Sequence, residues 1–158
     1  MKEILLTQNK VALVDDEDFE RLNQFKWCAA WDGYNWYAVR HSHRIAGNRK
    51  LIRMHREIMN APKHIQVDHR NGDGLFNCKK NLRLCTNQEN QFNRNRANKN
   101  NMLDIKGVAW IEKKKKFRSR IQINGKTIHL GYFNVMGDAD SAYRIAEEKY
   151  FGEFAGRV

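Results

Sequence analysis

The 158 residues are enough for one domain or for two small ones, and a hydrophobic fraction of 41% with four Trp and eight Phe excludes wholesale disorder. A formal net charge of +11, from 29 Lys and Arg against 18 Asp and Glu, favours a polyanionic partner. No apolar run reaches the ~18 residues of a membrane span, and the first ten residues lack a signal peptide's hydrophobic segment. We therefore expect a cytoplasmic protein with no membrane partner.

Basic residues are segregated from acids along the chain. The stretch between Gly33 and Arg56 contains no acid, and neither does the stretch between Lys113 and Lys126, which holds seven basic residues. The basic residues of the first stretch are Arg40, Arg44, Arg49, Lys50, Arg53 and Arg56. Acids instead cluster in residues 15–20, DDEDFE. Segregated Lys and Arg neutralise phosphates, so nucleic-acid binding is favoured over a merely solvated cationic surface.

The N-terminal third of the chain predicts strands and helices in alternation. Residues 4–6 and 10–14 indicate two short strands, and residues 15–25 a helix with acids in its first turn. Residues 26–31 and 34–41 are aromatic-rich strands joined by Asp32-Gly33, a hairpin signal. Residues 51–59, LIRMHREIM, predict a second helix that ends before Pro62.

The middle of the chain predicts a strand, a loop, a second strand and a helix. Residues 64–69, HIQVDH, lead into a Gly- and Asn-rich loop, and residues 81–86, NLRLCT, form the second extended run. Thr86-x-x-Glu89 fits a capping box, which starts a helix by satisfying its free N–H groups. Asn90 then lies on the first turn of that helix.

Four residues of this segment suit phosphodiester hydrolysis. If Asp68 and Asn90 converge, their oxygens form a hard site for a divalent cation, completed by water and substrate phosphate. His69 points to the opposite side of the strand from Asp68 and can act as general base. Asn81 would hydrogen-bond across the loop or to His69 and hold the ring in place.

These residues also resemble the signature of HNH homing endonucleases, in the variant whose last His is Asn. The likeness runs through MHREIM, VDHRNGD and NLRLCTNQENQFNR over roughly residues 50–95, and extends to N-terminal segments of phage and bacterial members. It implies a ββα-metal nuclease fold with Asp68 and Asn90 as metal ligands, His69 as base and Asn81 as the supporting amide. It also implies Mg²⁺ as cofactor, with Mn²⁺ as a substitute, and a bacterial or phage-infected host cell.

A zinc site is not expected. Three cysteines, Cys28, Cys78 and Cys85, leave one unpaired in any disulfide scheme, which is typical of a reducing compartment. Cys78 and Cys85 lie near the loop, but the chain contains no CxxC pair.

The C-terminal third predicts a second unit after an Asn-rich basic linker. Residues 106–111, 116–123 and 126–133 read as three strands, the last two joined by Asn124-Gly125, and residues 137–152 as a closing helix that ends near Gly152. The helix residues at helical spacing are Ala139, Ala142, Tyr143, Ala146 and Tyr150. Because this helix covers only one face of the sheet, the strand alternation leaves Arg118, Arg120 and Gln122 on an open face suited to the DNA major groove.

This unit resembles the APETALA/ethylene-response-factor DNA-binding domain over nearly all of residues 105–155. Thr127 and His129 stand on the third strand where the plant pattern has other groove-facing residues, so the sequence preference does not carry over. The expected groove contacts are Trp110, Arg118, Arg120, Gln122 and His129. The expected phosphate contacts are Lys113, Lys114, Lys115 and Lys116, together with Arg94 and Arg96 of the linker.

Together these patterns predict an α+β protein with a ββα-metal (HNH) nuclease domain over residues 1–93, a linker over 94–104 and a DNA-binding domain over 105–158. This second domain is a small three-stranded antiparallel sheet packed on one helix. The predicted function is site-directed, homing-type cleavage of double-stranded DNA by a monomer or a transient dimer. The main alternative is a sequence-specific DNA-binding regulator without cleavage activity. A restriction or packaging nuclease and an RNA-binding module are further alternatives.

Overall fold

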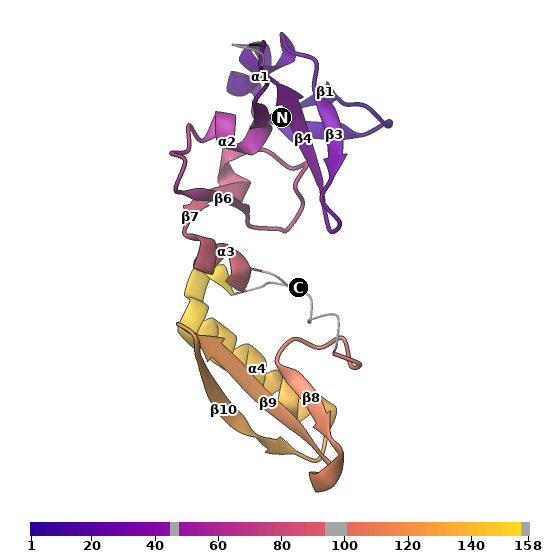
Figure 1. The fold of residues 1–158 in the computed structure, drawn as a ribbon, viewed down its shortest axis with the longest axis vertical. Coiled ribbons are helices and arrows are strands. Elements are labelled where there is room, and N and C mark those ends of the chain that lie inside the picture. Colours follow the sequence, from indigo (N-terminus) through magenta and orange to yellow (C-terminus); the bar gives the residue numbers. More distant parts are fainter. Residues whose placement is uncertain (45–47, 94–100, 156–158) are drawn as a thin grey trace. The chain divides into compact units, whose positions relative to one another are not determined.

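The computed structural model describes residues 1–44, 48–93 and 101–155, and the chain divides into two compact units, Met1–Gln91 and Phe92–Val158 (Figure 1). The described residues form four small antiparallel sheets and four α-helices. This mixed architecture agrees with the predicted α+β class. None of the helices in the described ranges is long and apolar enough to cross a membrane.

The first unit begins with two hairpins. Strands β1 (Lys2–Leu5) and β2 (Val11–Val14) pair antiparallel and lead into α1 (Asp16–Asn23). Strands β3 (Cys28–Trp31) and β4 (Trp36–His41) form the second hairpin, with Gly33 in its turn at a φ of +98°. A residue with a Cβ is strained at that angle, so this turn favours glycine. The predicted Asp-Gly hairpin turn is confirmed.

The predicted helix over residues 51–59 is wrong in its first three residues. Leu51–Arg53 is strand β5, paired with β4, and only Met54–Ile58 is helical (α2). Along β5, Ile52 packs on the core whereas Leu51 and Arg53 are exposed, which is strand alternation. Hydrogen bonding to the edge of β4 therefore makes residues 51–53 a strand, although their apolar residues are spaced as in a helix.

The first unit has one hydrophobic core. Trp27, which follows α1, is almost completely buried. Its indole Nε1 donates to the carbonyl of Leu22 in the last turn of α1, 2.9 Å away. The other buried members are Ile4, Leu6, Ala12, Val14, Leu22, Ala29, Ala38, Met54, Ile58, Val67 and Leu82. Both hairpins, two helices and the strands that carry the site thus share a single core.

The middle segment folds as predicted into strand, loop, strand and helix. Strand β6 (Gln66–His69) pairs antiparallel with β7 (Leu82–Cys85), and α3 (Asn87–Phe92) follows directly. The capping box is confirmed, because the Thr86 N–H donates to Glu89 Oε2 at 2.7 Å and the Glu89 N–H donates to Thr86 Oγ1 at 3.2 Å.

The second unit is a three-stranded sheet covered on one face by a helix, as predicted. Strands β8 (Val108–Ile111), β9 (Lys116–Ile123) and β10 (Lys126–Phe133) are antiparallel, and α4 (Met136–Phe151) packs on them. Short 3₁₀ turns are Glu112–Lys114 and Gly152–Phe154. The β9–β10 turn has positive φ at Asn124 and Gly125.

One residue at helical spacing in α4 does not join the core of this unit. Tyr150 is 43% exposed, whereas the next residue, Phe151, is buried with Ile121, Tyr143 and Ala146. Phe151 stacks on Phe92 with ring centroids 3.7 Å apart.

Candidate active site

The candidate site is built on β6 and on the loop that connects it to β7. The strand register places Asp68 opposite Arg83 and His69 opposite Leu82. Asp68 and His69 are both buried, at 6% and 5% exposure. Because neighbours on a strand point to opposite faces, the carboxylate and the imidazole lie on opposite sides of the ribbon.

Asp68 forms an ion pair inside the first unit. Two nitrogens of the Arg83 guanidinium converge on one carboxylate oxygen, Oδ2, with Nε at 2.8 Å and Nη2 at 2.6 Å. Arg83 itself is only 6% exposed. The sequence does not reveal this partner, since the pairing of Asp68 with Arg83 depends on a strand register that the residue types do not encode.

His69 is oriented by a buried amide that was not among the predicted site residues. Its Nε2 lies 3.2 Å from Oδ1 of Asn77. The Asn77 Nδ2 donates to the carbonyls of Leu75 at 3.0 Å and Gly74 at 3.4 Å, which turns Oδ1 toward the imidazole. An amide oxygen only accepts, so Nε2 of His69 carries the proton and Nδ1 carries the lone pair.

Two further rings enclose His69. The His55 ring meets it edge-on with centroids 5.0 Å apart, and the Tyr37 ring lies 5.9 Å away. Burial lowers the pKa of His55 to about 3 and also lowers the pKa of His69. Both imidazoles are therefore neutral at pH 7, the form in which His69 can accept a proton.

Asn81 holds the loop closed from its far end. Its side-chain Nδ2 donates to the Phe76 carbonyl at 2.7 Å and to Asn71 Oδ1 at 2.9 Å, while its Oδ1 accepts from the Asn71 N–H at 3.1 Å. Its backbone carbonyl accepts from the Arg70 N–H at 2.8 Å. Asn81 thus ties residues 70–76 together, whereas the side-chain contact to His69 comes from Asn77.

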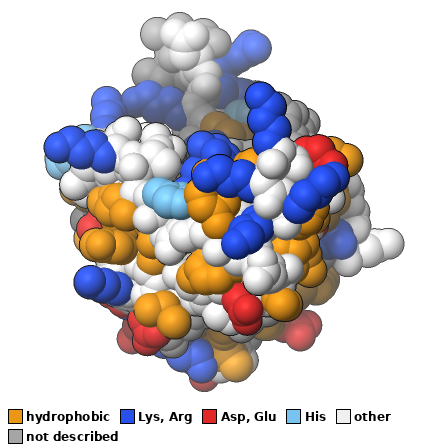
Figure 2. Space-filling view, turned by 90° about the horizontal axis from the view of Figure 1, so that it is seen from below, with side chains coloured by type: hydrophobic (Ala, Val, Ile, Leu, Met, Phe, Trp, Pro, Cys, Tyr) orange, Lys and Arg blue, Asp and Glu red, His pale blue; other side chains and the backbone are white. Residues whose placement is uncertain are grey.

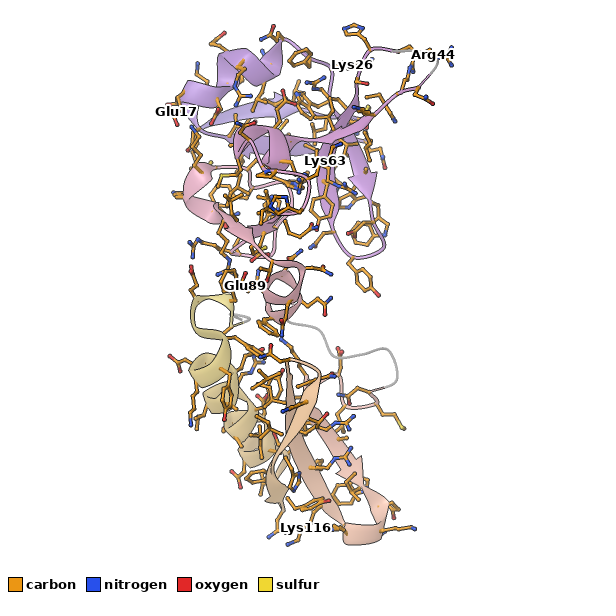
Figure 3. All side chains as sticks on the ribbon, turned by 60° about the vertical axis from the view of Figure 1, so that its left-hand side comes forward. Glu17, Lys26, Arg44, Lys63, Glu89 and Lys116 are labelled. Carbon is orange, nitrogen blue, oxygen red and sulfur yellow. The ribbon has the colours of Figure 1, made fainter. Side chains whose placement is uncertain are left out.

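The loop also docks on the N-terminal elements. The Leu13 N–H donates to the Leu75 carbonyl at 2.9 Å, and the Asn77 N–H donates to the Leu13 carbonyl at 2.7 Å. The Lys79 N–H donates to Asp15 Oδ2 at 2.7 Å, and its ammonium pairs with Glu17 on α1. Glu17 is labelled in Figure 3. Part of the acidic segment 15–20 therefore anchors the loop.

Asn90 lies on α3, directly after the strand that pairs with β6. Its N–H donates to the Thr86 carbonyl at 3.1 Å, and its side chain is half-buried. Asp68 and Asn90 together offer hard oxygen donors, which fit Mg²⁺ in chemistry. No group of three or more His, Cys, Asp or Glu that could hold a metal exists within residues 1–44, 48–93 and 101–155.

The cysteines near the loop carry protonated thiols. Cys78 and Cys85 are buried, and desolvation raises the pKa of each to about 11.

The open face of the second unit's sheet carries most of the predicted groove contacts. Cross-strand partners share a face, and the pairs are Arg118 with Tyr132, Arg120 with His129 and Gln122 with Thr127. Trp110 instead pairs with Phe117, on the opposite face from Arg118 and Arg120, where its ring packs on the Phe117 ring at 4.8 Å and stays 41% exposed. The register therefore separates Trp110 from the arginines.

The predicted phosphate contacts surround one end of this sheet. Lys113 and Lys114 lie in a 3₁₀ turn, and Lys115 follows with a φ of +50° and an ion pair to Glu112. Lys116 begins β9 at the end of the sheet (Figure 3). In the space-filling view, Lys and Arg side chains are interspersed with hydrophobic ones (Figure 2). Arg94 and Arg96 lie outside the described residues.

Two arginines of the first acid-free stretch have structural roles. Arg40 Nη2 pairs with Glu57 at 3.0 Å, and Arg56 donates to the carbonyls of Ile65 at 2.6 Å and Pro62 at 2.7 Å. The exposed basic residues that remain in this stretch are Arg44, Arg49, Lys50 and Arg53.

Two viral proteins are similar to this chain. A protein of Acanthamoeba polyphaga mimivirus, named as an uncharacterized HNH endonuclease, is 29% identical over 128 residues, which are 77% of this chain and 65% of the relative. The chain thus spans less than two thirds of that relative's length. Protein 3.8 of Escherichia phage T7 is 28% identical over 111 residues, which are 67% of this chain and 90% of the relative.

No family model matches the chain. No solved structure matches it either. The comparisons thus make the chain similar to a protein named for nuclease activity, and the arrangement around His69 is the feature that bears on such chemistry.

Proposed function

We propose that this chain is a Mg²⁺-dependent endonuclease that hydrolyses phosphodiester bonds of double-stranded DNA. The observation that carries the proposal is the buried His69, oriented by Asn77 and next to Asp68 in the sequence. The mimivirus relative is named as an HNH endonuclease, which supports the same reaction class. We further propose that the β6–loop–β7–α3 segment is a ββα-metal site.

In this proposal His69 is the general base. Its Nδ1 takes a proton from a water molecule that attacks the phosphorus, while Nε2–H stays bound to Asn77 Oδ1 and fixes the ring. Burial lowers the pKa of His69, which favours an unprotonated Nδ1 at neutral pH. Asn81 acts through the loop backbone, because its hydrogen bonds hold the segment between His69 and Asn77.

Asp68 and Asn90 are the proposed metal ligands, with water and phosphate oxygens completing the coordination. Mg²⁺, or Mn²⁺ in its place, would neutralise charge on the scissile phosphate and stabilise the leaving oxygen. A single carboxylate in the ligand set makes the substrate itself part of the binding site.

The second unit is the proposed targeting domain. Arg118, Arg120, Gln122 and His129 share the face that α4 leaves uncovered, and an exposed Arg and Gln face suits the major groove. The lysines of residues 113–116 are proposed phosphate contacts. Site choice by this unit would make cleavage site-directed, as in a homing endonuclease.

Cleavage of plasmid DNA tests the proposal. We expect the purified chain to convert supercoiled plasmid to nicked or linear product with Mg²⁺, and to stop when the metal is chelated. Asp68→Asn should lose cleavage while still shifting the same DNA in a gel. Binding without any cleavage by the natural chain would support a DNA-binding regulator instead.

A further inference from the structure

Arg83 faces the one carboxylate among the proposed metal ligands. Its guanidinium lies within 2.6–2.8 Å of Asp68 Oδ2, and both side chains are about 94% buried. Salt and water screen a buried pair much less than an exposed one, so the positive charge of Arg83 acts strongly on Asp68. A charge at this position affects any second cation that binds the same carboxylate.

The ion pair offsets the charge that would attract a divalent ion to Asp68. Asp68 contributes −1 and Arg83 contributes +1, so the ion pair is formally neutral. Asn90 adds an uncharged amide. A bound DNA phosphate would bring the negative charge that this set lacks.

We propose that Arg83 is an electrostatic gate that keeps the divalent-cation affinity of Asp68 low until a DNA phosphate enters the site. The inference rests on the proposed nuclease function and deepens it, because it makes cation binding depend on substrate. Arg83 is then a positioning residue, which acts through Asp68 and not on the reacting atoms.

The gate has a consequence for metal affinity in the absence of DNA. Removing the positive charge while keeping a polar side chain, as in Arg83→Gln, should tighten Mn²⁺ binding by ~10-fold or more, because like charges a few ångströms apart repel strongly in a buried site. Arg83→Lys keeps the charge and should stay within about threefold of the natural chain. A merely structural Arg83 would not separate these two variants by charge.

The experiment is a Mn²⁺ titration of the full chain without DNA, followed by calorimetry or by the electron paramagnetic resonance of free Mn²⁺. Natural chain, Arg83→Gln, Arg83→Lys and Asp68→Asn are compared after circular dichroism has shown that each is folded. Tighter binding by the Gln variant alone supports the gate. Equal affinity of the Gln and Lys variants, or tighter binding by both, overturns it.

If the Gln variant does not fold, Mn²⁺ binding by the natural chain with and without DNA tests the gate. DNA-free protein should bind Mn²⁺ with a dissociation constant on the order of 1 mM or weaker, and a bound, uncleaved duplex should tighten it by ~10-fold or more. Micromolar binding without DNA overturns the gate.

The Asp68→Asn variant separates the two proposals. If it leaves both Mn²⁺ binding and plasmid cleavage unchanged, the proposed active site is wrong. If it removes both while Arg83→Gln binds Mn²⁺ like the natural chain, only the gate is wrong.

Discussion

His69 is surrounded by groups that fix its tautomer and its charge. Asn77 accepts from Nε2, and the rings of His55 and Tyr37 contact the imidazole. Asp68 and His69 could be selected from the sequence because an Asp-His pair before a Gly-rich loop is a distinctive pattern. Asn77 could not, since many asparagines populate this segment and only the folded loop shows which one meets the imidazole.

The depressed pKa of His55 makes stability depend on pH. Its ordinary value of 6.5 falls to about 3 in the folded chain, so the unfolded state binds more protons between these values. The contribution of His55 to the free energy of unfolding is therefore fully present above pH 6.5. It is lost as the pH falls toward 3, by at most about 1.4 kcal/mol per pH unit.

Replacing His55 should flatten this dependence. In thermal unfolding between pH 7 and pH 4.5, His55→Phe should lose less melting temperature than the natural chain, although it need not be more stable at pH 7. The exposed His64→Phe is the matched control and should follow the natural chain. Parallel curves for the natural chain and His55→Phe would show that His55 is not buried in its neutral form.

Asn77 should matter to catalysis through the tautomer of His69. Asn77→Leu removes the acceptor for Nε2–H and should lower the cleavage rate by roughly 100-fold. Asn77→Asp keeps an acceptor, restores part of the rate and raises the pKa of His69, which moves the acid limb of the pH–rate profile to higher pH. An unchanged acid limb in Asn77→Asp would contradict this hydrogen bond.

At the level of elements, turn and cap residues made much of the fold predictable. The Asp32-Gly33 and Asn124-Gly125 turns and the Thr86–Glu89 capping box form as expected, because these residues favour their local geometry whatever surrounds them. Residues 51–53 were predicted as helix but form a strand, because they pair with the edge of β4. Strand register, which joins Arg83 to Asp68 and removes Trp110 from the arginine face, depends on the whole sheet.

The capping box should stabilise the helix that carries Asn90. Thr86→Ala removes the acceptor for the Glu89 N–H, and we expect about 1 kcal/mol lower stability in urea unfolding. Thr86→Ser keeps the hydroxyl and should stay within a few tenths of a kcal/mol of the natural chain. Equal losses in the two variants would mean that the hydroxyl does not cap α3.

Across the whole molecule, each unit has its own core and its own basic residues. The excess of +11 that suggested a nucleic-acid partner is partly structural, because Arg40, Arg56 and Arg83 are held inside the first unit. The exposed remainder includes the sheet face of the second unit. Net charge therefore indicated the class of partner, while the folded chain is needed to show which cations can reach it.

The two kinds of contact on that face should respond differently to substitution. Lys116→Gln should reduce the slope of log affinity against log salt by about one, without changing site choice. Arg120→Ala, on the same strand face, should relax discrimination between sites by ~1–3 kcal/mol per base pair contacted. Binding to a random-sequence duplex pool at several salt concentrations measures both effects. Identical behaviour of the two variants would contradict the assignment of Lys116 to phosphate contacts and Arg120 to base contacts.

The most direct measurement compares cleavage and DNA affinity in His69→Ala with those of His64→Ala, which alters an exposed histidine of the same unit. We predict that His69→Ala cuts plasmid DNA at least ~100-fold more slowly with Mg²⁺, binds the same DNA within about twofold of the natural chain, and that His64→Ala behaves like the natural chain in both assays. Cleavage by His69→Ala at the natural rate, or an equal loss of cleavage and affinity, would contradict His69 as the base.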